Sequence, residues 1–285
     1  MPAVFFNAEA SVSAQKEDNE MGLLKDCKRV VVKVGTSTLT HSTGALNLRR
    51  LEALARVLSD FQNMGKRVIL VSSGAVSAGV AKTGRDRHPD HISIGEKQAM
   101  AAIGQSELMK LYDRFFSDFG HTVAQMLLTR DVVDNPHRRE LAESTFERLL
   151  EMGCIPVVNE NDPVSVDELT KFGGNDILSA HVAILSHADI LLNLSDVDGL
   201  YSGDPRRDPN ARLIERVEDP DAVMDMAGGA GTELGTGGMT AKLKAAVLAR
   251  NAGVPMFIMN GQDPAALYRL LDGDHVGTYF PVKKA

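Results

Sequence analysis

The sequence has few cysteines, no excess of positive charge and no long hydrophobic run. Its two cysteines, Cys27 and Cys154, fall in no metal-binding or redox spacing, which predicts free thiols in a reducing cytoplasm. Its 285 residues carry 38 acidic and 31 basic side chains, and the formal net charge of -7 argues against nucleic acid or an anionic membrane as the main partner. No apolar stretch approaches the roughly 18 residues that a transmembrane helix needs. These absences predict a cytoplasmic protein in which any anion site is local.

The amino-terminal residues also lack the features of a targeting segment. They have no basic region, and the short apolar group at residues 4–6 precedes a polar run, so neither a signal peptide nor a membrane anchor is predicted. We expect residues 1–21 to form a flexible extension. With 44% hydrophobic residues, the chain can bury a large core, and its length suits one large α/β unit or two lobes.

A lysine interrupts the first apolar run. Residues 30–34 show the pattern of a strand buried on both faces of a parallel sheet, except for Lys33. A buried ammonium group is costly unless an anion meets it, and Gly35, Thr36 and Ser37 follow at once with backbone amides and hydroxyls. The stretch therefore resembles half of a phosphate site. Taken alone, however, it favours a lysine that reaches out of the strand end into solvent.

Later apolar strands also end in polar residues. Strands are expected at residues 68–71, 155–158 and 190–194, with helical segments between them. Because the carboxyl ends of parallel strands meet at one edge of an open sheet, where ligands bind, their polar residues are expected to converge there. Lys33 belongs to the strand at residues 30–34, Ser73 follows the strand at 68–71, and Asp162 follows the strand at 155–158. Ser195 and Asp196 follow the strand at 190–194.

A second lysine follows a glycine-rich stretch. Residues 228–238 contain six glycines and lead into a helix that is expected to begin at Met239 and to carry Lys242 in its first turn. Helix amides and a lysine attract phosphate, although neither the Walker A motif nor the dinucleotide fingerprint occurs. Asn175 and Asp176 precede another helix, and as an isolated pair they are best interpreted as helix caps.

This combination of residues is typical of phosphoryl transfer. Two lysines at glycine-containing turns would neutralise charge on a moving phosphoryl group, and carboxylates at strand ends would hold Mg²⁺ or orient the lysines. The residues alone leave the substrate open.

Seven stretches in series resemble the amino acid kinase family, and within it the branch that acts on L-glutamate. The resemblance runs from residue 30 to residue 280, and its stretches are VVVKVGTS, VSSGAVSAG, QMLLTR, PVVNENDPV, GGNDILSA, LSDVDGLY and LGTGGMTAK. It implies an α/β fold, a three-layer αβα sandwich with a mostly parallel open sheet of about eight strands. It also implies one kinase domain over residues 22–285, with an acceptor lobe at about 22–180 and an ATP lobe at about 181–285.

The resemblance implies roles for individual residues. Lys33 and Lys242 match the family's two lysines at the transferred phosphate, and Asp176 matches the aspartate that holds them. The matched substrate-binding residues are Ser73, Asp162 and Asn175. The matched ATP-binding residues are Lys33, Ser195, Asp196, Thr236, Gly237, Gly238, Met239, Thr240, Ala241 and Lys242. No metal ligand is assigned. Gly174 and Ser195 stand where relatives often carry Asp and Thr, and many relatives continue into a small RNA-binding-like domain, whereas this sequence stops at Ala285.

The implied reaction is ATP-dependent phosphorylation of the side-chain carboxylate of L-glutamate, the first step of proline synthesis, with Mg²⁺ as cofactor. The resemblance further implies feedback inhibition by proline, a glutamyl phosphate reductase as functional partner, and a homo-oligomer. Two alternatives remain. A sibling kinase would act on aspartate, N-acetylglutamate, carbamate or UMP, which the acceptor segment at residues 159–167 disfavours. A non-catalytic sensor of ATP or an amino acid is disfavoured by the presence of both lysines and Asp176.

Overall fold

The structure, a computed structural model, describes residues 23–84, 93–165, 172–205, 208–227 and 238–283. The extension expected at residues 1–21 lies outside the described residues. Residues 166 and 167 of the acceptor segment also lie outside them.

The described residues form a seven-stranded sheet in the order β3-β4-β2-β1-β5-β6-β7. The first six strands in the sequence all run parallel to one another, and β7 runs antiparallel to β6. The mostly parallel sheet expected from the sequence is therefore confirmed. The strands are β1 (Arg29–Val34), β2 (Arg67–Ser72), β3 (Val123–Leu128), β4 (Ile155–Glu160), β5 (Ile190–Ser195), β6 (Met256–Asn260) and β7 (Thr278–Phe280).

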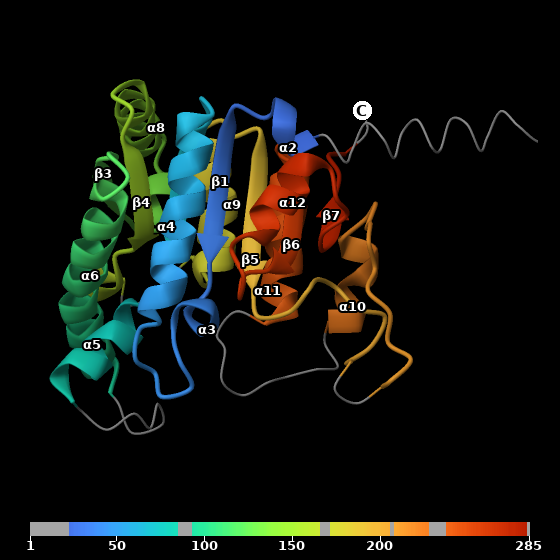
Figure 1. Cartoon of the computed structure of the whole chain (residues 1–285), viewed down its shortest axis with the longest axis horizontal. Helices are drawn as coiled ribbons and strands as arrows, with labels where there is room; N and C mark the ends of the chain where they lie inside the picture. Colours follow the sequence, from blue (N-terminus) through green and yellow to red (C-terminus); the bar gives the residue numbers. More distant parts are fainter. Residues whose placement is uncertain (1–22, 85–92, 166–171, 206–207, 228–237, 284–285) are drawn as a thin grey trace, which may run out of the picture.

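Helices cover both faces of the sheet, which gives the three-layer αβα sandwich predicted above (Figure 1). On the near face of Figure 1 lie α4 (Leu48–Asn63), α6 (Ile94–Ser117) and α12 (Ala266–Asp272). On the far face lie α8 (Pro136–Glu151), α9 (Asn175–Leu185) and α11 (Met239–Asn251). The shorter helices are α2 (Leu23–Asp26), α3 (Thr36–Leu39), α5 (Ala75–Thr83), α7 (Asp131–Asp134), α10 (Met224–Ala227), η2 (Asp162–Val164) and η3 (Asp221–Val223).

The central strands divide the core into two clusters. In β1, Val30 and Val32 pack with side chains of α4, α6 and α12, whereas Val31 packs with α9 and α11. Successive residues of a strand point to opposite faces, so a strand covered by helices on both sides needs apolar residues at every position. This explains the continuous apolar runs, and it places Lys33 on the same face as Val31.

Two glycines let α5 cross α6 at very short range. A Cβ atom at Gly104 would lie 1.7 Å from the carbonyl oxygen of Ala75, and one at Gly79 would lie 2.0 Å from that of Met100. Any side chain there would overlap backbone, so only glycine permits this contact. The crossing fixes α5, which begins directly after the end of β2, against α6.

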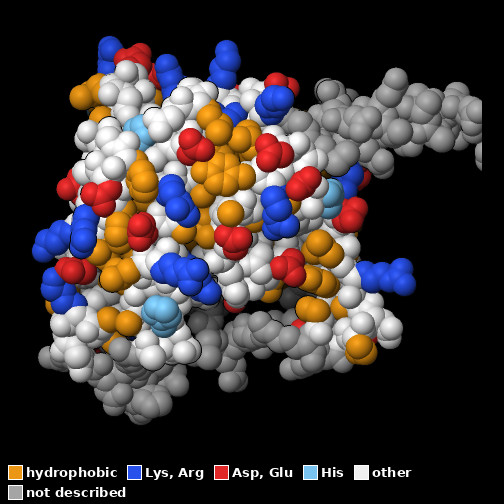
Figure 2. Space-filling view, in the orientation of Figure 1, with side chains coloured by type: hydrophobic (Ala, Val, Ile, Leu, Met, Phe, Trp, Pro, Cys, Tyr) orange, Lys and Arg blue, Asp and Glu red, His pale blue; other side chains and the backbone are white. Residues whose placement is uncertain are grey.

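Charge on the visible face is mixed, because acidic and basic side chains are interspersed over α4, α6 and α12 (Figure 2). Among the described residues, Cys27 and Cys154 are both free and buried, as expected. No helix in the described part of the chain is long and apolar enough to cross a membrane.

Candidate active site

Lys33, Asp176 and Lys242 form a buried ionic cluster on the far face of the sheet. Lys33 Nζ lies 2.6 Å from Asp176 Oδ1, and Lys242 Nζ lies 3.2 Å from Asp176 Oδ2. The three side chains are only 6%, 2% and 9% exposed. The residues come from β1, from the first turn of α9 and from the first turn of α11. Lys33 therefore does not reach into solvent, as its strand taken alone favoured, and the two lysines share one carboxylate.

The backbone before each helix explains this meeting. Gly173 and Gly174 have φ angles of 84° and 103°, which glycine adopts without strain, and they turn the chain into α9 with Asp176 in its first turn. Gly238 occupies the cap position of α11, so Lys242 also lies near a helix amino terminus. The positive ends of both helices thus point towards the cluster, an arrangement that favours anions.

Burial and charge act against each other in the cluster. Burial alone would raise the pKa of Asp176, but the ammonium groups of Lys33 and Lys242 and the hydrogen bonds that it accepts hold its pKa below the ordinary value. Burial lowers the pKa of Lys33, and Lys242 lowers it further, against the opposing effect of Asp176. Two ammonium groups and one carboxylate leave an excess of one positive charge when all are ionised, so an arriving phosphate would be attracted.

Asn193 is part of the cluster although the sequence analysis did not select it. Its Nδ2 donates a hydrogen bond of 2.8 Å to Asp176 Oδ1, and on β5 it is the register partner of Lys33. The signal that reveals Lys33, a polar residue inside an apolar strand, is also present at this position.

A second polar network lies beside the cluster at the ends of β2 and β4. Asn175 Nδ2 donates to Ser73 Oγ at 2.9 Å and to Asn159 Oδ1 at 2.8 Å, and Asn159 Nδ2 donates to Gln105 Oε1 at 2.9 Å. The network thus joins α9, the ends of β2 and β4, and α6. Because Asn175 and Asp176 are consecutive, it adjoins the ionic cluster directly.

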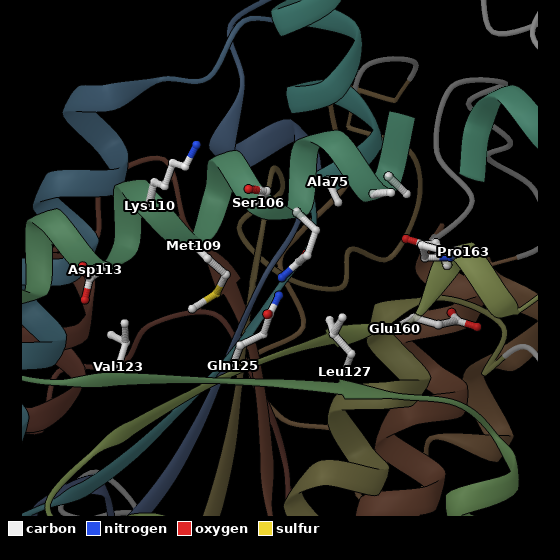
Figure 3. A pocket seen from close by; sticks show the side chains of 14 residues that line it. Ala75, Ser106, Met109, Lys110, Asp113, Val123, Gln125, Leu127, Glu160 and Pro163 are labelled. Atoms are coloured by element: carbon white, nitrogen blue, oxygen red, sulfur yellow. The ribbon is translucent and has the colours of Figure 1, made fainter. Parts of the chain in front are cut away.

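A cavity of about 620 Å³ opens next to this network, between α6 and β3. In Figure 3, Met109 of α6 and Gln125 of β3 face each other across it, and Glu160 lies at one end. Asp162 also lines the cavity, whereas Lys33 and Lys242 do not. Its volume suits a small molecule. The predicted Asp162 therefore lines a cavity that does not include Lys33 or Lys242 in its lining.

Glu160 is a further residue that the sequence analysis did not assign. It is buried at the end of β4, and its Oε1 accepts hydrogen bonds from Ser165 Oγ at 2.6 Å and from the Phe172 amide at 3.3 Å. Phe172 lies three residues before Asn175. Glu160 therefore ties the end of β4 to the segment that enters α9.

Apart from Lys33 on β1, the described residues expected at ATP lie at the end of β5 and at the start of α11. Ser195 is buried and donates to Asp196 Oδ1 at 3.2 Å, and its carbonyl oxygen accepts from the Gly261 amide. Asp196 is exposed and close enough to Lys33 to raise its pKa in part. Gly238, Met239, Thr240 and Ala241 open α11 ahead of Lys242, whereas Thr236 and Gly237 lie outside the described residues.

The amino acid kinase family model matches residues 28–260, which include every strand described above except β7. This chain belongs to the amino acid kinase family. Two relatives are glutamate 5-kinases. That of Clostridium perfringens is 50% identical over 265 residues, which cover 92% of this chain and 98% of the relative. That of Listeria innocua is also 50% identical over 265 residues, with coverage of 92% and 95%.

Solved structures place this amino acid kinase in the same fold as two distant kinases. The UMP kinase of Bacillus anthracis has a TM-score of 0.60 at 22% sequence identity, and the match covers 90% of this chain and 96% of the UMP kinase chain. The isopentenyl phosphate kinase of T. acidophilum has a TM-score of 0.61 at 17% identity, with coverage of 88% and 99%. At these identities the likeness establishes the fold alone.

Proposed function

We propose that this amino acid kinase transfers the γ-phosphoryl group of ATP to the side-chain carboxylate of L-glutamate, yielding L-glutamyl 5-phosphate and ADP. The observation that carries the proposal is the buried cluster in which Asp176 holds both Lys33 and Lys242. The relatives at 50% identity, which are glutamate 5-kinases, supply the acceptor.

In the proposed reaction, one oxygen of the acceptor carboxylate attacks the γ-phosphorus, and the bond from that phosphorus to the bridging oxygen of ADP breaks. The acceptor is already ionised at neutral pH, since glutamate has an ordinary pKa of about 4.3, so no general base is required. Catalysis then depends on positioning and on charge neutralisation.

Lys33 and Lys242 neutralise the oxygens of the transferred group. Both ammonium groups are already desolvated, so their attraction to a phosphate is stronger than it would be in water. ATP is expected to bring Mg²⁺ on its phosphates, because Mg²⁺ usually binds through substrate phosphates with only one or two protein carboxylates. The ion would offset phosphate charge that the lysines do not reach.

We further propose that the acceptor binds in the lobe at about residues 22–180 and ATP in the lobe at about 181–285. The network of Ser73 and Asn175, together with Asp162 beside the cavity, would hold glutamate, and the ends of β5 and α11 would hold ATP. The ionic cluster contains residues of both stretches, as transfer between two substrates requires.

Loss of an acceptor side chain is expected to act on glutamate rather than on ATP. Asp162→Ala and Asn175→Ala should each raise the KM for glutamate by roughly tenfold or more, the equivalent of one hydrogen bond to a charged group. Initial-rate measurements with each substrate varied in turn would test this. An equal rise in the KM for ATP would show that these residues were wrongly assigned to the acceptor.

Proline is proposed to inhibit by occupying the glutamate pocket. Proline shares the α-carboxylate and a cationic amine with glutamate but has no side-chain carboxylate, so it would fill the site without reacting. Inhibition should be competitive with glutamate and not with ATP, and Asp162→Ala should weaken proline and glutamate together. Non-competitive inhibition, or proline inhibition that survives unchanged in Asp162→Ala while glutamate binding is lost, would contradict a shared pocket.

The product and the setting lead to three further proposals. An acyl phosphate hydrolyses in water, so a glutamyl phosphate reductase is proposed to consume it promptly. A cytoplasmic location is proposed for two reasons. The cytoplasm supplies ATP, and its reducing conditions keep cysteines such as the two free ones of this chain as thiols. A homo-oligomer is also proposed, and β3 supports it, because it is an edge strand of the sheet formed by the described residues, and sheet edges are usually covered.

Release of ADP across a panel of acceptors tests the proposed function. We expect ATP-dependent turnover with L-glutamate and little with L-aspartate, N-acetyl-L-glutamate, carbamate or UMP. Turnover with another member of the panel instead would identify a sibling kinase. Binding of ATP without turnover of any acceptor would identify a sensor.

A further inference from the structure

Asn193 is an amide in the middle of a strand that is otherwise apolar up to its final residue. The sequence of β5 is ILLNLS, and Asn193 is 0% exposed. Its neighbour on β1 is Lys33, and its neighbour on β6 is the aliphatic Ile258. An aliphatic residue would suit the packing at this position, so the amide calls for a specific reason.

Only half of the amide is used within the described residues. Asn193 Nδ2 donates to Asp176 Oδ1, while Asn193 Oδ1 is buried without a hydrogen-bond partner. Reversing the amide would turn its oxygen towards the carboxylate, so the orientation with the NH₂ group on Asp176 is the favourable one. A residue that leaves an acceptor unsatisfied adds little to stability, which points to a role in the site.

The hydrogen bond falls where it orients the carboxylate. Asp176 Oδ1 is shared by Asn193 and Lys33, and Asp176 Oδ2 faces Lys242. With one oxygen held by β1 and β5 together, the carboxylate cannot rotate away without breaking a contact on one side. Asn193 does this without adding charge, so the excess positive charge of the cluster is retained.

We propose that Asn193 is a positioning residue for phosphoryl transfer, whose side chain fixes the Asp176 carboxylate between Lys33 and Lys242. The inference rests on the proposed function. Asn193 is expected to act on the rate of transfer, because its side-chain hydrogen bond goes to Asp176, which holds the two lysines.

Asn193→Leu tests the inference in the full-length enzyme. We expect kcat to fall about tenfold or more, the equivalent of one hydrogen bond to a charged group, while the KM values for glutamate and ATP stay within about threefold. Ile258→Val is the matched control, since it alters packing on the same face beside Asn193 without touching the hydrogen bond, and its kcat should stay within about twofold of wild type. Should Asn193→Leu fail to fold, Asn193→Asp keeps the size and shape of the side chain, replaces the donor by a second carboxylate, and should lower kcat at least as much.

A double-mutant cycle separates positioning from a general effect on the core. In an Asp176→Asn background, adding Asn193→Leu should change kcat by less than about twofold, because the residue acts through Asp176. A full additional loss of kcat in that background would overturn the inference. So would a wild-type kcat in Asn193→Leu or Asn193→Asp, or an effect of these substitutions on KM alone. Wild-type enzyme that fails to phosphorylate glutamate would instead refute the proposed function, so the two failures are distinguishable.

Discussion

Lys242→Ala is expected to lower kcat by about 10² or more while glutamate binding stays largely intact. The ammonium group of Lys242 is buried against Asp176, and in the proposed reaction it neutralises the transferred phosphoryl group rather than binding the acceptor. Initial rates with glutamate and ATP varied separately would measure both parameters. Lys244→Ala is the matched control, because Lys244 is exposed on the same helix. An unchanged kcat in Lys242→Ala would remove this lysine from catalysis.

Lys33→Ala is expected to behave in the same way, and the two losses should not add. Both lysines contact one carboxylate and, in the proposed reaction, act on one phosphoryl group, so the double variant should lose much less than the product of the single losses. Fully multiplicative losses would indicate that the lysines act at separate steps or on separate groups.

Asp176→Asn is expected to reduce both kcat and stability. The substitution leaves two buried ammonium groups without a counter-charge, and removal of one partner from a buried ion pair typically costs about 3–5 kcal/mol. Because Asp176 raises the pKa of Lys33, the variant should also lose activity at lower pH on the alkaline side than wild type does. Chemical denaturation and a pH profile of kcat would measure the two effects. Asp118→Asn, at an exposed position, provides the control.

The same carboxylate predicts an acid dependence of stability. The folded-state pKa of Asp176 lies below its ordinary value of 3.8, so its stabilising contribution is complete above that value and is lost as pH falls through the lowered pKa. Thermal unfolding of wild type should show this loss in acid, and Asp176→Asn should lack that part of it. Identical acid limbs for the two proteins would show that the pair does not stabilise the fold in this way.

The sheet and most helices follow from the sequence because their patterns are strong. β1, β2, β4 and β5 are apolar runs that lie close to the strand ranges expected above, and α11 begins at Met239 as expected. β7 has only three residues and pairs antiparallel with β6. A strand this short has no periodic pattern that would predict it. Its existence depends on the partner strand rather than on its own sequence.

The site is only partly predictable. Lys33 stands out because a charge in a buried strand demands a partner, yet nothing local reveals that the partner is Asp176, far away in the sequence. Asn193 interrupts an apolar strand as Lys33 does, but neither its contact with Asp176 nor the contact of Glu160 with Phe172 can be read from the sequence. Their contacts are defined by tertiary packing and become visible only when the helices are in place.

The pairing of β1 with β5 has a consequence for how the enzyme gains activity as it folds. At the start of that pairing, the Arg29 amide donates to Asp189 across 160 positions of sequence, and elsewhere Lys242 bonds to Asp176 across 66 positions. Contacts between residues so far apart raise the contact order and form slowly, because a long loop must close first. A nascent chain that ends before α11 has neither the second lysine nor its helix. Catalytic activity should therefore return last during refolding, later than the helical signal, and serve as a reporter of complete assembly.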